Sequence, residues 1–243
     1  MTQEPLIKVL TGAGVGSRRK VADLIRGEKV KVNSEIVTGF NHPINAGKDK
    51  VTVSGQPVLL QREETVYLML HKPKGVLSTA SDEQGRWTVM HLLPARYRKF
   101  RLYPVGRLDK ASTGLLLLTN DGDLTYQLTH PKFEQEKEYH VQIEGELSSA
   151  DRRGLVTGIK LEEGVTAPAK IREVAGAAEA PFNYVITIHE GKKRQVRRMF
   201  VALGHRVLAL KRVRFGKLTL GDLEEGRVRE LKAFESRLLR GKS

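Results

Sequence analysis

Cysteine is absent from this chain of 243 residues. Without a thiol the protein can form no disulfide, no thiolate nucleophile and no zinc site of the cysteine type. The lack of cysteine fits a reducing cytosol, and the first residues, MTQEPLIKVL, lack the apolar core of a secretory signal peptide. No apolar run approaches the roughly 20 residues that a membrane span requires. We therefore expect a cytoplasmic protein.

Motifs that hold metals or nucleotides are missing as well. The 7 His residues form no pair of the HExxH type, and no acidic loop has the spacing of an EF-hand. There is no P-loop, and the segment GAGVG does not follow a strand as a dinucleotide-binding turn must. A GxSxG nucleophile elbow is also missing. These absences predict no metal site and argue against nucleotide-driven enzymes and hydrolases of the GxSxG kind.

Acidic residues are scarce relative to basic ones. Only 28 Asp and Glu oppose 42 Lys and Arg, so the formal net charge is +14 and the sequence pI is near 10.0. The 40% of hydrophobic residues can build a core, and the mean hydropathy of −0.36 is typical of a soluble globular protein. A surface this basic attracts polyanions, of which nucleic acid is the commonest folded example. The alternative is a generally basic protein from a basic proteome.

The first part of the chain predicts a small α/β module. Leu6, Val9 and Leu10 recur at helical spacing before GAGVG breaks the helix, and Ser17 is placed to cap a second helix. The segments KVKVN and KVTVSG alternate like short strands, whereas GQPVLLQREET is typical of a connector. We predict a module at 1–60 and a linker at 61–65.

Three cations open the second predicted helix. Arg18, Arg19 and Lys20 occupy its first turn, where the helix macrodipole favours acidic side chains. Their position at the unfavourable end indicates that an external anion binds them.

The chain from Val66 onward predicts a long mixed sheet, mostly antiparallel and flanked by helices, so the fold class is α+β. VYLML, VGRLD and LLLLT are typical of strands, and EYHVQIEG and FNYVITIHEG alternate like half-buried ones. NDGD indicates a tight turn, and RQVRRMFVALGH has a helical pattern that Gly204 can end. We predict a domain at 66–236 and a basic tail at 237–243.

The segment 192–214 contains nine Lys and Arg residues and no acid. A charge run is ordinarily a solvated face. This one crosses a predicted loop, a helix and a strand, so it can converge on one surface and, with the cations of the first module, bind phosphates. Its members are Lys192, Lys193, Arg194, Arg197, Arg198, Arg206, Lys211, Arg212 and Arg214.

Asp109 stands out in VGRLDKAST because it is an acid between Arg107 and Lys110. A lone Asp after a strand is ordinarily a turn or cap residue. A catalytic carboxylate must instead stay ionised while partly desolvated, and a nearby Arg achieves this by stabilising the charged form. The segment KKRQVRR can supply that Arg.

The stretch GRLDKASTGLLLLTNDG closely resembles the catalytic motif of pseudouridine synthases of the RsuA/RluB/RluF group. Other landmarks of the group occur in the expected order: HKPKG at 71–75, KEYHV at 137–141 and EGKKRQVRRMF at 190–200. GVGSRRKVADLIRGEKVKVN resembles an S4 RNA-binding domain. The resemblance, which covers nearly the whole chain, implies an enzyme that breaks the N1–C1′ bond of a uridine in RNA, turns the base and rejoins it through C5. It implies no cofactor and no metal.

The resemblance also implies roles for single residues. Asp109 would be the essential carboxylate, whether it attacks C1′ covalently or removes a 2′ proton to give a glycal. Tyr139 would stack on the flipped uracil, Arg197 would pair with Asp109, and Ile188 would wall the base pocket, although a Tyr or Ile in a strand is ordinarily core. HKPKG is assigned to packing near the site. Further predicted RNA contacts are Arg107, Arg18, Arg19, Lys20, Lys192, Lys193, Arg194 and Arg198.

Ribosomal RNA is the partner that the resemblance favours. The RluB-like branch, which acts on 23S rRNA, is preferred over the RsuA-like branch, which acts on 16S rRNA. A non-catalytic RNA-binding ribosome-assembly factor is a second class, against which the intact set of Asp109, Tyr139 and Arg197 argues. A nucleoside-cleaving glycosidase is a third, but such enzymes generally need a second carboxylate at a defined distance. We expect a monomer without membrane association.

Overall fold

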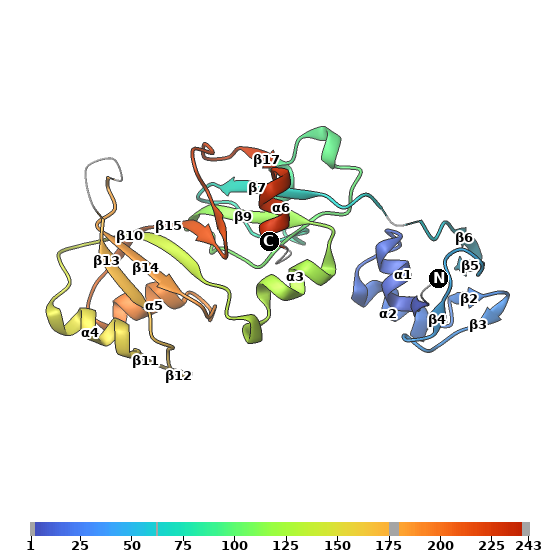
Figure 1. Cartoon of the computed structure of the whole chain (residues 1–243), viewed down its shortest axis with the longest axis horizontal. Helices are drawn as coiled ribbons and strands as arrows, with labels where there is room; N and C mark the ends of the chain where they lie inside the picture. The colour runs from blue at the N-terminus through green and yellow to red at the C-terminus, as the bar shows by residue number, and fades with distance from the viewer. Residues whose placement is uncertain (1–2, 62, 175–179, 240–243) are drawn as a thin grey trace. The chain divides into compact units, whose positions relative to one another are not determined.

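The computed structural model describes residues 3–61, 63–174 and 180–239 (Figure 1). The chain divides into two compact units, Met1–Thr65 and Val66–Ser243. Among the helices in the described ranges, none has the length and apolarity that spanning a membrane requires.

The first unit consists of two short helices and two small sheets. A four-stranded antiparallel sheet has the order β3-β2-β5-β6, and β1 pairs with β4. The elements are β1 (Glu4–Pro5), α1 (Leu6–Gly12), α2 (Arg18–Arg26), β2 (Val30–Val32), β3 (Glu35–Ile36), β4 (Pro43–Ile44), β5 (Val51–Val53) and β6 (Gln56–Val58).

Both predicted helices of this unit are confirmed. Ser17 caps α2 by accepting a hydrogen bond of 3.0 Å from the Lys20 amide. Val21 and Ile25 are fully buried in one apolar cluster with Leu6 and Leu10.

The assignment of GQPVLLQREET to a connector is wrong at its start, where Gln56–Val58 forms β6. Ser54 and Gly55 both have positive φ, at 50° and 81°, and this two-residue turn returns the chain antiparallel to β5.

The second unit is built on a nine-stranded sheet. Its main order is β13-β14-β10-β15-β9-β7-β17, while β16 pairs with β15 and β8 with β9. In the described part of this sheet every pairing is antiparallel except β15 with β9, which confirms the α+β prediction. The strands are β7 (Tyr67–Lys72), β8 (Tyr103–Pro104), β9 (Thr113–Thr119), β10 (Lys137–Ile143), β13 (Lys170–Glu173), β14 (Tyr184–Ile188), β15 (Val207–Phe215), β16 (Leu218–Thr219) and β17 (Val228–Glu230).

Helices and a small hairpin surround this sheet (Figure 1). The hairpin is formed by β11 (Lys160–Leu161) and β12 (Gly164–Val165). The α-helices are α3 (Gly122–Thr129), α4 (Ser149–Thr157), α5 (Gln195–Ala202) and α6 (Ala233–Leu239), and the 3₁₀ helices are η1 (Val89–Leu92), η2 (Ala95–Tyr97) and η3 (Pro131–Phe133).

The four consecutive leucines of β9 are explained by burial on both faces of the sheet. Leu116 and Leu118 belong to one apolar cluster, whereas Leu115 and Leu117 belong to another. Successive side chains of a strand point to opposite faces, so a strand covered on both sides needs no polar alternation.

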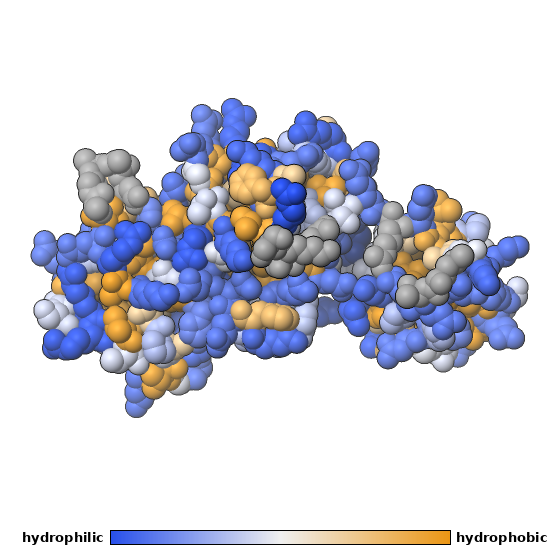
Figure 2. Space-filling view, in the orientation of Figure 1, coloured by the Kyte–Doolittle hydropathy of each residue, from blue (hydrophilic) through white to orange (hydrophobic). Residues whose placement is uncertain are grey.

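The face of the molecule shown in Figure 2 is mainly hydrophilic with scattered hydrophobic patches.

Three predictions for this unit are corrected. VGRLD is a loop between β8 and β9 and not a strand. NDGD does not form a hairpin turn, because the Asp121 carboxylate accepts a hydrogen bond of 3.0 Å from the Leu124 amide and begins α3. The predicted tail at 237–243 starts too early, since α6 continues to Leu239, which is buried. Residues 240–243 lie outside the described residues.

Candidate active site

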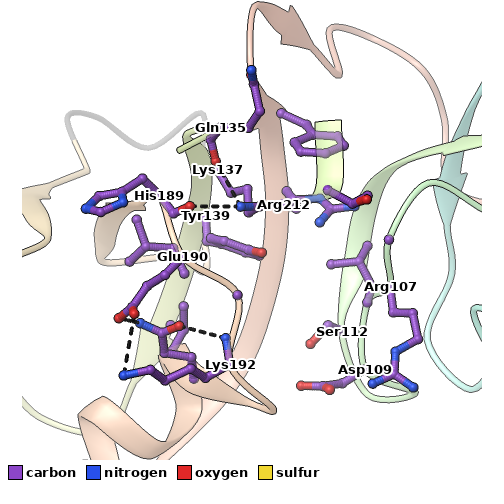
Figure 3. A pocket seen from close by; sticks show the side chains of 18 of the residues that line it. Arg107, Asp109, Ser112, Gln135, Lys137, Tyr139, His189, Glu190, Lys192 and Arg212 are labelled. Atoms are coloured by element: carbon purple, nitrogen blue, oxygen red, sulfur yellow. Dashed lines mark hydrogen bonds and ion pairs between the residues drawn. The ribbon is translucent and has the colours of Figure 1, made fainter. Parts of the chain in front are cut away.

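A cavity of about 450 Å³ lies in the second unit (Figure 3). The loop before β9, the start of β10, the end of β14, the start of α5 and strand β15 all contribute to its walls. The lining residues that matter here are Arg107, Asp109, Ser112, Gln135, Lys137, Tyr139, Ile188, Glu190, Lys192, Arg194 and Arg212. Segments of GRLDKASTGLLLLTNDG, KEYHV and EGKKRQVRRMF therefore meet at one cavity.

The loop that carries Asp109 is fixed by hydrogen bonds on both sides of the carboxylate. The Ser78 hydroxyl donates to the Leu108 carbonyl over 2.9 Å and accepts from the Leu108 amide over 3.1 Å. The Ser112 amide donates to the Asp109 carbonyl over 3.0 Å, which closes a tight turn. Asp109 itself is partly exposed and lines the cavity. The rigid loop thus presents one carboxylate to the pocket.

Lys72 also supports the loop that carries Asp109. Its side chain is fully buried, and its ammonium donates to the carbonyls of Pro73 and Ser112 over 2.8 and 2.9 Å. Burial lowers the pKa of Lys72 to about 8, while the charges of Glu225 and Asp109 act in the opposite direction. The Gly75 amide adds a bond of 2.8 Å to the Lys110 carbonyl. HKPKG therefore does more than the predicted packing, since it holds the Asp109 loop by hydrogen bonds.

Tyr139 and Ile188 both line the cavity. Tyr139 is 8% exposed on β10 and reaches into the cavity between Lys137 and the loop that carries Asp109 (Figure 3). Ile188, at the end of the neighbouring strand β14, is 4% exposed and lines the same space. An aromatic ring and an aliphatic wall next to a carboxylate form a slot suited to a planar base.

Arg197 acts on the Asp109 loop through the backbone. The predicted direct pairing is not seen, because no ion pair within 4.0 Å joins Arg197 to Asp109 in the described residues. Its guanidinium instead donates to the carbonyls of Ala111 and Val207 over 3.2 and 3.1 Å. Burial lowers the pKa of Arg197, and the negative charge of Asp109 partly offsets this. Arg197 is thus placed to fix the position of the loop and to contribute positive charge near the carboxylate.

The basic run at 192–214 divides into inward and outward members. Arg198, the next residue, is outside the cavity lining and makes a two-pronged ion pair with Glu163, which lowers the pKa of the Glu163 carboxyl to about 2. Lys192 lines the cavity and pairs with Glu190 at 3.5 Å. Arg214 is engaged with two glutamates, so the run is not one continuous free surface.

The remaining predicted RNA contacts are exposed. Arg107 and Arg194 line the cavity, and Arg194 precedes α5 with a φ of 51°. Lys193 is exposed and outside the lining. In the first unit, Arg18, Arg19 and Lys20 are exposed on α2, whose first turn contains no acid.

Sequence reasoning assigned no site role to Lys72, Lys137, Ser112, Gln135 and Glu190, which lie in or beside the cavity. A signal existed for Lys72, because it ends the mostly apolar strand YLMLHK and a buried ammonium requires partners. For the other four, no sequence pattern separates a pocket residue from an ordinary surface one.

The comparisons with known proteins agree with this geometry. The family model for RNA pseudouridylate synthase matches residues 66–202. The chain belongs to this family. It is therefore an enzyme, an RNA pseudouridine synthase, and its reaction is an isomerisation.

Similar proteins match almost the whole chain. "Ribosomal large subunit pseudouridine synthase B" of Bacillus subtilis is 45% identical over 98% of this chain and 96% of its own length. An uncharacterised RNA pseudouridine synthase of Aquifex aeolicus is 39% identical over 95% of this chain and 91% of its own. A crystal structure of a pseudouridylate synthase is 32% identical, with a TM-score of 0.68 over 97% of this chain and 99% of that one.

Proposed function

We propose that this enzyme converts one uridine of the 23S rRNA to pseudouridine, in the cytoplasm, and that residues 1–60 act as an S4-type RNA-binding domain. The similarity to the B. subtilis large-subunit enzyme supports the choice of RNA, because it extends over both units. The exposed cations of α2 support RNA binding by the first unit. The first turn of α2 contains no acidic residue that could neutralise them, so they are available to phosphates.

The observation that carries the chemistry is the meeting of Asp109, Tyr139 and Ile188 at one cavity. A uridine must leave its stack to reach a pocket of this kind. The flipped base stacks on Tyr139 against Ile188, and the carboxylate of Asp109 faces the sugar. As the N1–C1′ bond breaks, positive charge develops on the sugar, and an ionised carboxylate at this position stabilises it.

Arg197, Lys72 and Ser78 hold the carboxylate in position. They do so through the carbonyls and amides of its loop, so the Asp109 oxygens remain available to the substrate. A carboxylate held in a fixed position is what attack on C1′ and removal of a 2′ proton both require.

Tritium release from rRNA labelled at uridine C5 tests the activity, because forming the C5–C1′ bond expels that hydrogen. A pure RNA-binding protein releases none, and a glycosidase yields free uracil. Mapping pseudouridines in both rRNAs from cells with and without the gene tests the target. Loss of one pseudouridine from 23S rRNA is expected, and loss from 16S rRNA alone would contradict the large-subunit assignment.

A further inference from the structure

Arg212 is a buried cation in the cavity that the roles assigned above do not use. It lies on β15 directly opposite Tyr139 of β10 and is 2% exposed (Figure 3). Its Nε donates to the Leu115 carbonyl over 2.8 Å, and its guanidinium lies 5.0 Å from the centre of the Phe215 ring. Its Nη2 has no hydrogen-bond partner among the described residues. A buried charged donor without a partner is costly, on the order of 1–3 kcal/mol or more, so a substrate group is expected to complete it.

Lys137 is a second cation beside the same space. It stands two residues before Tyr139 on β10, and its ammonium donates to the carbonyls of Gln135 and His189 over 2.9 and 3.2 Å. Burial lowers the pKa of Lys137 to about 8, and the positive charge of Arg212 adds to that effect.

Glu190, an acid that also lines the cavity, forms no ion pair with these two cations in the described part of the chain. The charge of Glu190 raises the pKa of Lys137 against the effects of burial and of Arg212, but the Glu190 carboxylate already accepts hydrogen bonds from the Ala167 amide and the Gln195 side chain. It also pairs with Lys192. In the described residues, Arg212 and Lys137 have no ion pair with any carboxylate within 4.0 Å, so this end of the cavity is built for negative charge.

The isomerisation generates negative charge on the base. When the N1–C1′ bond breaks, its electron pair stays on N1, and the charge spreads to the carbonyl oxygens O2 and O4. Turning the base about the N3–C6 line exchanges N1 with C5 and O2 with O4. A fixed donor that binds one carbonyl before the turn therefore meets the other after it. C5 then bonds to C1′, C5 loses its proton and N1 gains one, so nothing is consumed.

We propose, on the basis of the function assigned above, that Arg212 and Lys137 form a subsite for the carbonyl oxygens of the detached uracil and stabilise its negative charge while it turns. Tyr139 supplies the stacking surface beside the two cations. Asp109 acts on the sugar at the loop side of the cavity, and this pair acts on the base at the strand side.

The test compares two substrates in single-turnover reactions of the full-length enzyme. One RNA carries uridine at the target position and the other 5-fluorouridine, whose electron-poor base is a better leaving group. Arg212→Gln should slow consumption of the uridine target about 100-fold, as loss of one oxyanion donor does. On the fluorinated RNA the loss should be under about tenfold. RNA affinity should change less than about threefold, because the charge forms only after binding.

Equal losses on both substrates would overturn the proposal, because they would show that Arg212 serves only the fold or binds the RNA backbone. Full activity of the variant would overturn it too. Arg172→Gln is the control for net charge, since Arg172 is an exposed cation of the same sheet that faces Glu138. Failure of the wild-type enzyme to release tritium from uridine RNA would instead reject the function itself.

Lys137→Gln gives a second route if Arg212→Gln does not fold. The loss of rate in this variant should also be larger on the uridine RNA than on the 5-fluorouridine RNA. Because the pKa of Lys137 is about 8, the wild-type turnover rate should fall as the pH rises through that value and the ammonium deprotonates. The variant should lack this part of the alkaline decline. An unchanged pH profile together with equal losses on both substrates would remove Lys137 from the subsite.

Discussion

The two units of this enzyme carry positive charge in different environments. In the first unit, Arg18, Arg19 and Lys20 are exposed on one helix turn and have no acid in that turn. In the second, Lys72 and Arg197 are buried, and backbone carbonyls hold them. Exposed charges exchange counterions with a polyanion and set affinity, whereas buried charges fixed by the backbone set geometry. Substitutions in the first unit should therefore change RNA affinity, whereas substitutions of the buried cations in the second unit should change the reaction rate.

Loss of the carboxylate should have the largest effect. Asp109→Ala removes the carboxylate that is proposed to face the sugar, so turnover should fall by at least about 10⁴-fold. RNA binding should stay within about tenfold of wild type, because the altered charge and positioning should change the binding free energy by no more than about 1.4 kcal/mol. Tritium release and filter binding measure the two quantities. Activity near that of the wild type would end the assignment of Asp109.

The next effect concerns the arginine that holds the loop. Arg197→Gln should lower the rate at saturating RNA about 100-fold, because a carboxylate displaced by about 1 Å loses that much. Its affinity for RNA should change little. Arg198→Gln changes the adjacent outward cation, which pairs with Glu163, and should leave the saturated rate within about threefold. Similar losses in both variants would mean that the inward position of Arg197 is irrelevant.

At Gly114 a substitution is expected to change the stability of the fold through steric overlap and not through charge. A Cβ at this position would lie 2.2 Å from the Arg212 carbonyl oxygen, and the φ is +108°. Gly164 has a φ of +114°, and a Cβ added there would meet no described atom within 4 Å, so Gly164→Ala carries the backbone strain alone. Gly114→Ala should lower the free energy of unfolding by about 2 kcal/mol more than Gly164→Ala does, as measured by urea denaturation. Equal effects would show that β9 and β15 can move apart to accommodate the added Cβ at no cost in free energy.

The first unit should give the smallest effect on the reaction. Replacing Arg18, Arg19 and Lys20 together by Ala should reduce the slope of log affinity against log salt concentration by about 2, since each phosphate contact contributes roughly 0.7 on single-stranded RNA. The rate at saturating RNA should not change. An unaltered salt slope would exclude this helix turn from the RNA contact.

The motifs predicted which segments line the cavity because each motif is local in sequence. The positions of Asp109, Tyr139 and Ile188 around one pocket follow from three short segments and the sheet that joins them. The partner of Arg197 was not predictable, because the choice between a carboxylate and the Ala111 carbonyl depends on tertiary packing. The same holds for Arg212, whose burial is set by strands distant in sequence.

Errors in the predicted elements arose at turns. NDGD contains residues that both tight turns and helix starts use, and only the Asp121 contact with the Leu124 amide distinguishes the two. Strand β6 follows Ser54 and Gly55, and its short length gave no clear alternation. VGRLD alternates like a strand, yet Leu108 is tied to Ser78 and not to a neighbouring strand.

The single parallel pairing within the described sheet, that of β15 with β9, joins segments about 100 residues apart in the chain. A nascent polypeptide that has emerged only through α5 already contains Asp109 and Tyr139, but it lacks the strand that closes the cavity. The complete catalytic surface is therefore assembled late in synthesis. An incompletely translated copy should be unable to modify RNA, even while its first unit is exposed on the ribosome that makes it.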